Sequence, residues 1–307
     1  MTTELALYIS VVTFSFLCVF LNKKPIWVVI SYLLCAAFMW EVRRVGFDID
    51  MKGYAAVLHY NFSFDASSTY YAREFVYWFG ASYLFQIINN EQITFWVIDL
   101  VWLFLLHKGL WSNHTDSPMP LYTIPFLVIF FPALMGYENV YRQLIACMVV
   151  IYAFFGTKRV ISASLIAFLA LFIHNAAIIY LPFLYLYSAT KGFSVARVKN
   201  LNKLIFAFSY IVVIGGVYYT TLGDTEFGKS SSSTGLSLSF AYALVFVAML
   251  FMSLYMARFR FSVLFKRHFY IVYSFLTFLL CVPILGPAQA ERIEICLLYT
   301  SPSPRDS

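Results

Sequence analysis

The chain has 307 residues, of which 62% are hydrophobic and only 12% are charged, with a formal net charge of +6. This composition excludes a soluble globular protein, because no soluble core could bury so much apolar surface. It predicts an all-α fold, a polytopic integral membrane helical bundle. The five cysteines show no paired spacing, so the sequence indicates neither a disulfide framework nor a zinc site.

Apolar runs that we interpret as membrane spans begin near the N-terminus and recur along the chain, and several are a little short, so their ends must reach into the interface. They cover Leu5–Leu21, Pro25–Trp40, Ile93–His107, Leu121–Leu134, Val140–Phe155, Leu204–Thr220, Leu236–Met256 and His268–Leu285. Two shorter runs, Val160–Phe172 and Asn175–Tyr187, meet at His174. Because both segments that flank this pair are basic, we expect a tight helical hairpin rather than one long helix. The sequence therefore predicts about ten transmembrane helices.

Basic residues set the expected orientation. They concentrate in five loops, 22–24, 108–120, 156–159, 188–203 and 258–267, which the positive-inside rule places in the cytoplasm. The alternation of spans then holds only if Phe75–Ile88 does not cross, so we expect a re-entrant or interfacial helix there. The whole of Glu41–Glu91, including Arg43, becomes one outer segment. Arg142, His174 and Arg292 fall on the same outer face.

The C-terminal end breaks from this pattern. Cys296–Asp306 reads CLLYTSPSPRD, which resembles a translated sequencing adapter. We therefore expect a single polytopic membrane domain over residues 1–295, incomplete at its C-terminus, and an adapter-derived tail over residues 296–307.

Three polar residues on the outer face have the chemistry of a transferase site. Arg142 opens an apolar helix, where its charge and the helix N-terminus suit a phosphate or diphosphate. His174 can exchange a proton near neutral pH, and Arg292 supplies a second cation. Each has a structural alternative: an arginine that reaches the headgroups, a histidine that bonds to the hairpin backbone, and an arginine that pairs with Glu291. Together they suit glycosyl transfer from a lipid diphosphate sugar, in which arginines stabilise the leaving diphosphate and a base activates the acceptor hydroxyl.

Two acidic features have open interpretations. The pair Asp48 and Asp50 could hold a divalent metal, contact a sugar hydroxyl or act as a carboxylate base, or lie in a solvated turn. Asp99 lies within an apolar run, where a functional role competes with a structural hydrogen bond inside the bundle. The aromatic residues around Tyr54 could stack on sugars or form an interfacial belt.

The order of short motifs resembles the EpsG family of Wzy-type polysaccharide polymerases over about residues 40 to 295. The motifs are Gly46-Phe47-Asp48-Ile49-Asp50 with Tyr54, Glu74-Phe75, Arg142-Gln143 with Ala146, Phe172-Ile173-His174-Asn175-Ala176-Ala177, and Glu291-Arg292-Ile293.

The resemblance implies a multi-pass protein of the bacterial inner membrane that joins undecaprenyl-diphosphate-linked oligosaccharide repeat units at the outer face. It implies a membrane glycosyltransferase that needs no cofactor and no metal. Its expected partners are membrane lipid and, among proteins, a chain-length regulator. No nucleic acid is expected to bind. We assign catalytic roles to His174, Arg142 and Arg292. We assign substrate binding to Gln143, Asp48, Asp50, Tyr54, Glu74 and Glu138. The alternatives are a glycosyltransferase that uses a lipid-monophosphate sugar and a transporter of lipid-linked glycans.

Overall fold

The structure is a computed structural model, and every regular element that it describes is a helix, in agreement with the all-α prediction. It describes residues 3–21, 24–59, 71, 74–111, 121–129, 136–137, 140–157, 159–175, 177, 238–256 and 258–260. The chain divides into two compact units, Met1–Ala177 and Ile178–Ser307. In the second unit, the described residues are α13 (Leu238–Met256) and residues 258–260.

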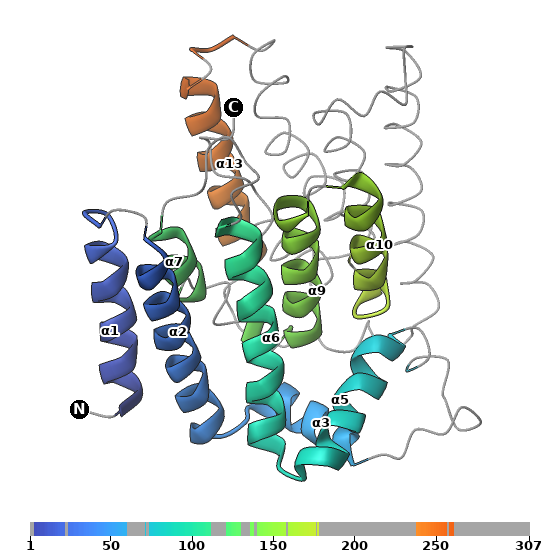
Figure 1. The fold of residues 1–307 in the computed structure, drawn as a ribbon. Coiled ribbons are helices and arrows are strands. Elements are labelled where there is room, and N and C mark those ends of the chain that lie inside the picture. The colour runs from blue at the N-terminus through green and yellow to red at the C-terminus, as the bar shows by residue number, and fades with distance from the viewer. Residues whose placement is uncertain are drawn as a thin grey trace, which may run out of the picture. The chain divides into compact units, whose positions relative to one another are not determined.

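The first unit is built on four helices that lie side by side (Figure 1). They are α1 (Thr3–Leu17), α2 (Pro25–Val45), α6 (Glu91–Trp111) and α9 (Tyr141–Ile151). Helix α1 packs on α2 and on the short α7 (Thr123–Ile129), while α6 packs on both α2 and α9. Helix α10 (Val160–Leu171) packs on α9. Because α6 contacts helices on both sides, it forms the centre of this unit.

Two further helices, α3 (Ile49–Leu58) and α5 (Phe75–Ile88), lie at the end of this unit where α2 ends and α6 and α9 begin (Figure 1). The backbone N–H of Val76, at the start of α5, donates to the carbonyl of Phe172 beyond the end of α10 at 3.1 Å. Helix α5 ends at Asn89, two residues before α6 begins. Helix α5 therefore starts and ends at the same end of the unit.

Local sequence explains where these helices begin and end. Pro25 lies in the first turn of α2, where its missing N–H costs no hydrogen bond. Gly46 follows α2 with φ of 131°, which a residue with a side chain rarely adopts. Asp48 then caps α3 by accepting a hydrogen bond from the Met51 N–H at 3.0 Å. Asn89 ends α5 in the left-handed conformation, with φ of 54°.

Helices α6 and α9 approach closely at two glycines. The π-helix η2 (Tyr152–Gly156) continues α9, and a Cβ at Gly109 of α6 would lie 3.1 Å from the Cα of Tyr152 and 3.4 Å from the carbonyl oxygen of Ile151. A Cβ at Gly156 would lie 3.3 Å from the Cα of Gly109. The absence of side chains at both positions permits this backbone contact.

The predicted spans agree with the structure in part. Among the described residues, two helices are long and apolar enough to cross a membrane, Pro25–Val45 and Glu91–Leu110. Helices α1, α5, α9 with η2, and α10 are apolar but shorter. The predicted runs Leu204–Thr220 and His268–Leu285 lie outside the described residues, as does nearly all of Asn175–Tyr187.

The predicted end of the second apolar run at Trp40 was too early. Helix α2 does not stop at Trp40 but continues to Val45, and the Arg43 side chain is fully buried inside the first unit. The physical reason is an ion pair with Asp99 of α6, which compensates the charge of the buried guanidinium.

Candidate functional site

The centre of the candidate site is the side chain of Arg142, in the first turn of α9. We use the name Arg142 cluster for Tyr54, Glu74, Tyr77, Trp78, Arg142 and His174. Arg142 is 9% exposed and forms an ion pair with Glu74, which is 4% exposed and directly precedes α5. A buried guanidinium needs such a partner, because burial of an isolated charge is costly.

The Glu74 carboxylate connects three parts of the chain. Its Oε2 pairs with Arg142 Nη1, and its Oε1 accepts a hydrogen bond from the backbone N–H of Asn175 at 3.1 Å. The same Oε1 lies 3.9 Å from Nε2 of His174. The single carboxylate of Glu74 therefore binds both the beginning of α9 and the segment that follows α10.

Aromatic rings surround the guanidinium of Arg142. Its Cζ lies 4.7 Å from the centre of the Trp78 ring and 5.4 Å from that of Tyr54. Such contacts between a cation and a ring face stabilise a guanidinium that has left water. The Tyr54 ring also contacts Tyr77, at 6.1 Å between ring centres.

Tyr77 adds a buried hydroxyl to the cluster. This hydroxyl finds no hydrogen-bond partner within the part of the chain that the structure describes. Burial raises the pKa of Tyr77 well above its ordinary value, so the hydroxyl keeps its proton at neutral pH and can act as a donor.

His174 has a side chain that is more open to solvent than those of Arg142 and Glu74. Its side chain is 23% exposed, against 10% for Arg142 and 6% for Glu74. It follows the end of α10, where its backbone N–H donates to the carbonyl of Ala170 at 3.0 Å. A partly exposed imidazole can exchange a proton with a substrate near neutral pH, and the nearby carboxylate of Glu74 favours its protonated form.

Helix α3 brings Tyr54 to the cluster and is held by contacts to its neighbours. Ser82 of α5 donates its hydroxyl to the carbonyl of Leu58 at 3.1 Å, and His59 pairs with Glu91 at 2.7 Å. Asp48, the predicted substrate ligand, has the local role of capping α3. Asp50 is exposed in the first turn of the same helix.

The structure thus brings together four of the predicted site residues, Tyr54, Glu74, Arg142 and His174. Gln143 is buried next to Arg142 in the first turn of α9. The predicted residues Glu138 and Arg292 lie outside the described residues. Within the described ranges, no group of three or more His, Cys, Asp or Glu side chains could hold a metal ion.

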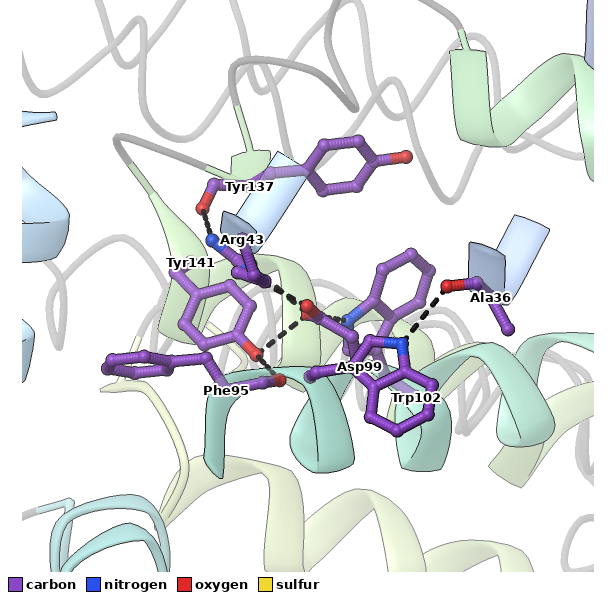
Figure 2. A network of polar contacts seen from close by, with 8 residues as sticks. Ala36, Arg43, Phe95, Asp99, Trp102, Tyr137 and Tyr141 are labelled. Carbon is purple, nitrogen blue, oxygen red and sulfur yellow. Dashed lines mark hydrogen bonds and ion pairs between the residues drawn. The ribbon is translucent and has the colours of Figure 1, made fainter. Parts of the chain in front are cut away.

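A second polar cluster lies deeper in the first unit, and we call it the Asp99 network. It consists of Arg43, Asp99, Trp102, Tyr137 and Tyr141 (Figure 2). Arg43 binds Asp99 through two hydrogen bonds, Nε to Oδ2 at 2.7 Å and Nη2 to Oδ1 at 3.1 Å. Trp102 Nε1 and the Tyr141 hydroxyl each donate to Asp99 Oδ1 at 2.8 Å. The structural hydrogen bond favoured for Asp99 is therefore present, with an ion pair in addition.

Sequence reasoning missed the pairing of Arg43 with Asp99 and the contacts of Trp78 with Arg142. The signal for the first was an acidic residue within one apolar run and an arginine just beyond another. The signal for the second was an aromatic residue one helical turn after Glu74.

Comparison with known proteins adds no relative to this picture. No protein-family model matches the chain, and neither a curated protein nor a solved structure matches it.

Proposed function

We propose that the protein is a multi-pass membrane glycosyltransferase of the bacterial inner membrane. It polymerises undecaprenyl-diphosphate-linked oligosaccharide repeat units at the outer face, in surface or exopolysaccharide synthesis. The observation that carries this proposal is the Glu74 carboxylate, which joins a buried arginine to a partly exposed histidine. The resemblance of the motifs around Asp48, Arg142 and His174 to the EpsG family also supports it.

Membrane insertion is supported by the length of α2 and α6 and by the exposed surface, and about ten spans is the number that the apolar runs of the sequence predict. Helices α2 and α6 each have 21 residues, which at 1.5 Å per residue gives about 30 Å, the thickness of a bilayer core. Large apolar side chains are exposed on several helices of the first unit, including Phe16 at 70%, Phe104 at 55% and Ile161 at 70%. Exposure of this kind is costly in water and favourable against lipid tails.

The position of the Arg142 cluster supports chemistry at the outer face. Helices α3 and α5 lie at one end of the first unit (Figure 1). The basic loops 22–24, 108–120 and 156–159 connect helix ends at the opposite end of this unit: the end of α1 and the start of α2, the end of α6, and the end of η2 and the start of α10. The positive-inside rule assigns those loops to the cytoplasm. The Arg142 cluster then faces the compartment in which lipid-linked repeat units are polymerised.

In the proposed reaction, the bond between the anomeric carbon and the phosphate oxygen breaks, and undecaprenyl diphosphate leaves. The acceptor hydroxyl oxygen forms the new bond to the anomeric carbon and gives its proton to the imidazole of His174. Arg142 stabilises the negative charge on the leaving diphosphate through charge-assisted hydrogen bonds. Glu74 orients Arg142 through their ion pair, and its charge, 3.9 Å from Nε2 of His174, stabilises the imidazolium that forms.

The remaining assigned residues bind substrate in this proposal. Tyr54 supplies a ring face for a sugar, and Gln143 and Tyr77 supply hydrogen-bonding groups beside Arg142. Arg292 is the second cation for the diphosphate. Glu138, Asp48 and Asp50 contact sugar hydroxyls.

The test compares purified protein in lipid nanodiscs on repeat units linked to either a diphosphate or a monophosphate carrier. We expect elongation of the diphosphate-linked substrate and a loss of more than about 100-fold for Arg142→Ala. Arg142→Lys should recover little activity, because an ammonium cannot form two parallel bonds to a diphosphate. Full activity of Arg142→Ala would contradict the proposal. So would elongation of the monophosphate-linked substrate by the parent protein together with loss of activity in Asp48→Asn.

A further inference from the structure

The Asp99 network is buried and has no role in the proposed chemistry. Its contacts are not confined to α2 and α6 but extend to α9. Arg43 and Asp99 have side chains with 0% exposure. Figure 2 shows Asp99 between Arg43, Tyr141 and Trp102, so that one carboxylate receives donors from three helices. A buried network with this many satisfied groups is rigid, because each bond restricts the others.

The network reaches the beginning of α9 by three contacts. The Tyr141 hydroxyl donates to Asp99 at 2.8 Å, and Arg43 Nη1 donates to the carbonyl of Tyr137, just before α9, at 3.2 Å. The Arg43 guanidinium also lies 4.7 Å from the centre of the Tyr141 ring. The N-cap residue of α9, Val140, provides no side-chain cap. The beginning of α9 is therefore held by these three contacts, without the help of a capping hydrogen bond.

Tyr141 directly precedes Arg142, and its ring also contacts the wall of the Arg142 cluster. Its ring centre lies 6.5 Å from that of Tyr54 and 6.2 Å from that of Tyr77. Tyr141 is therefore bonded to the Asp99 network through its hydroxyl and packed against the Arg142 cluster through its ring. A shift of the first turn of α9 would move Arg142 relative to Glu74 and His174.

From this geometry we infer that Arg43 and Asp99, acting through Tyr141, are positioning residues for Arg142. The inference rests on the proposed function, which it deepens by naming what holds the diphosphate-binding arginine in place. Its chemical reason is that transfer requires the reacting groups to be placed closely, and a displacement of about 1 Å can lower a rate about 100-fold. The alternative is that the Asp99 network only stabilises the fold.

The first test is a double-mutant cycle on the elongation rate. Tyr141→Phe removes one hydroxyl and keeps the ring, and we expect kcat/KM to fall about tenfold. In the Arg142→Lys background, the same change should have less than about a twofold effect, because the group it positions has already been altered. Equal effects of Tyr141→Phe in both backgrounds would overturn the inference.

The matched control is Tyr32→Phe. Tyr32 of α2 donates its hydroxyl to the carbonyl of Leu100 in α6 at 3.0 Å, so the change removes one hydrogen bond between the two helices that carry Arg43 and Asp99. In each background, Tyr32→Phe should change the elongation rate of that background by less than about twofold. A loss as large as that of Tyr141→Phe would overturn the inference, since any contact between α2 and α6 would then have the same effect.

The second test does not depend on turnover. We expect the melting temperatures of Tyr141→Phe, Glu74→Gln and the double variant, measured on the whole protein in detergent, to show coupling. The loss in the double variant should be smaller than the sum of the single losses, although the two side chains belong to different clusters. Additive losses would overturn the inference. If the parent transfers no glycan, the proposed function fails, and this cycle alone decides whether the Asp99 network positions Arg142.

Discussion

The ion pair of Arg43 with Asp99 allows a quantitative prediction of stability. Both side chains are fully buried, and two hydrogen bonds of 2.7 and 3.1 Å join them. Removal of one partner leaves a charge inside the helical unit, which typically costs about 3–5 kcal/mol. We therefore expect Arg43→Met and Asp99→Leu each to lower the free energy of unfolding by about that amount. The double variant should lose less than the more damaging single change, because it leaves no unpaired charge.

The assay is reversible unfolding in mixed micelles, in which the fraction of an unfolding detergent is raised and helicity is followed by circular dichroism. Tyr32→Phe is the control, since it removes one neutral hydrogen bond between the same helices and should cost about 1 kcal/mol. Single losses below about 1 kcal/mol, or losses that add in the double variant, would refute the reasoning that the two charges compensate each other.

Three further predictions concern packing, capping and topology. Gly109→Ala should destabilise by about 1–3 kcal/mol, because its methyl group would lie 3.1 Å from the backbone of η2. Gly80→Ala should instead stabilise by about 0.4–1 kcal/mol, since a Cβ there meets nothing within 4 Å; thermal unfolding compares the two. Asp48→Ala should cost about 1 kcal/mol by loss of the α3 cap, and Asp48→Asn should retain most of that stability; a larger loss in the Asn variant would show that the charge itself is needed. In intact cells, an impermeant maleimide should label a cysteine at Lys52 but not one at Lys24; the reverse pattern would place the Arg142 cluster in the cytoplasm.

Elements bounded by strong local signals could be predicted from the sequence. The bounds of α5 agree with the apolar run Phe75–Ile88, because a charged residue precedes it and Asn89 can adopt the left-handed conformation that ends it. The start of α9 was also predicted to within one residue, Val140 against Tyr141. In both cases the information lies within a few residues of the boundary.

The pairings that organise the interior could not be read from local patterns. Arg43 and Asp99 are 56 residues apart, and Arg142 and Glu74 are 68 residues apart. An isolated arginine near the end of an apolar run is compatible with a headgroup contact as well as with burial, and only the fold selects between them. The same limit applies to Glu74, whose assignment came from the motif resemblance and whose contacts with Arg142 and Asn175 came from the structure.

The central claim is that the Arg142 cluster transfers glycan with His174 as the base, and elongation by a His174→Ala variant tests it most directly. The control is His59→Ala, which removes an exposed histidine that pairs with Glu91, outside the Arg142 cluster. Purified proteins in nanodiscs would receive undecaprenyl-diphosphate-linked repeat units, and product length would be followed over time. We predict a rate about 10²- to 10⁴-fold lower for His174→Ala, with substrate still bound, and a rate near that of the parent for His59→Ala. Elongation by His174→Ala at the parental rate would contradict the account.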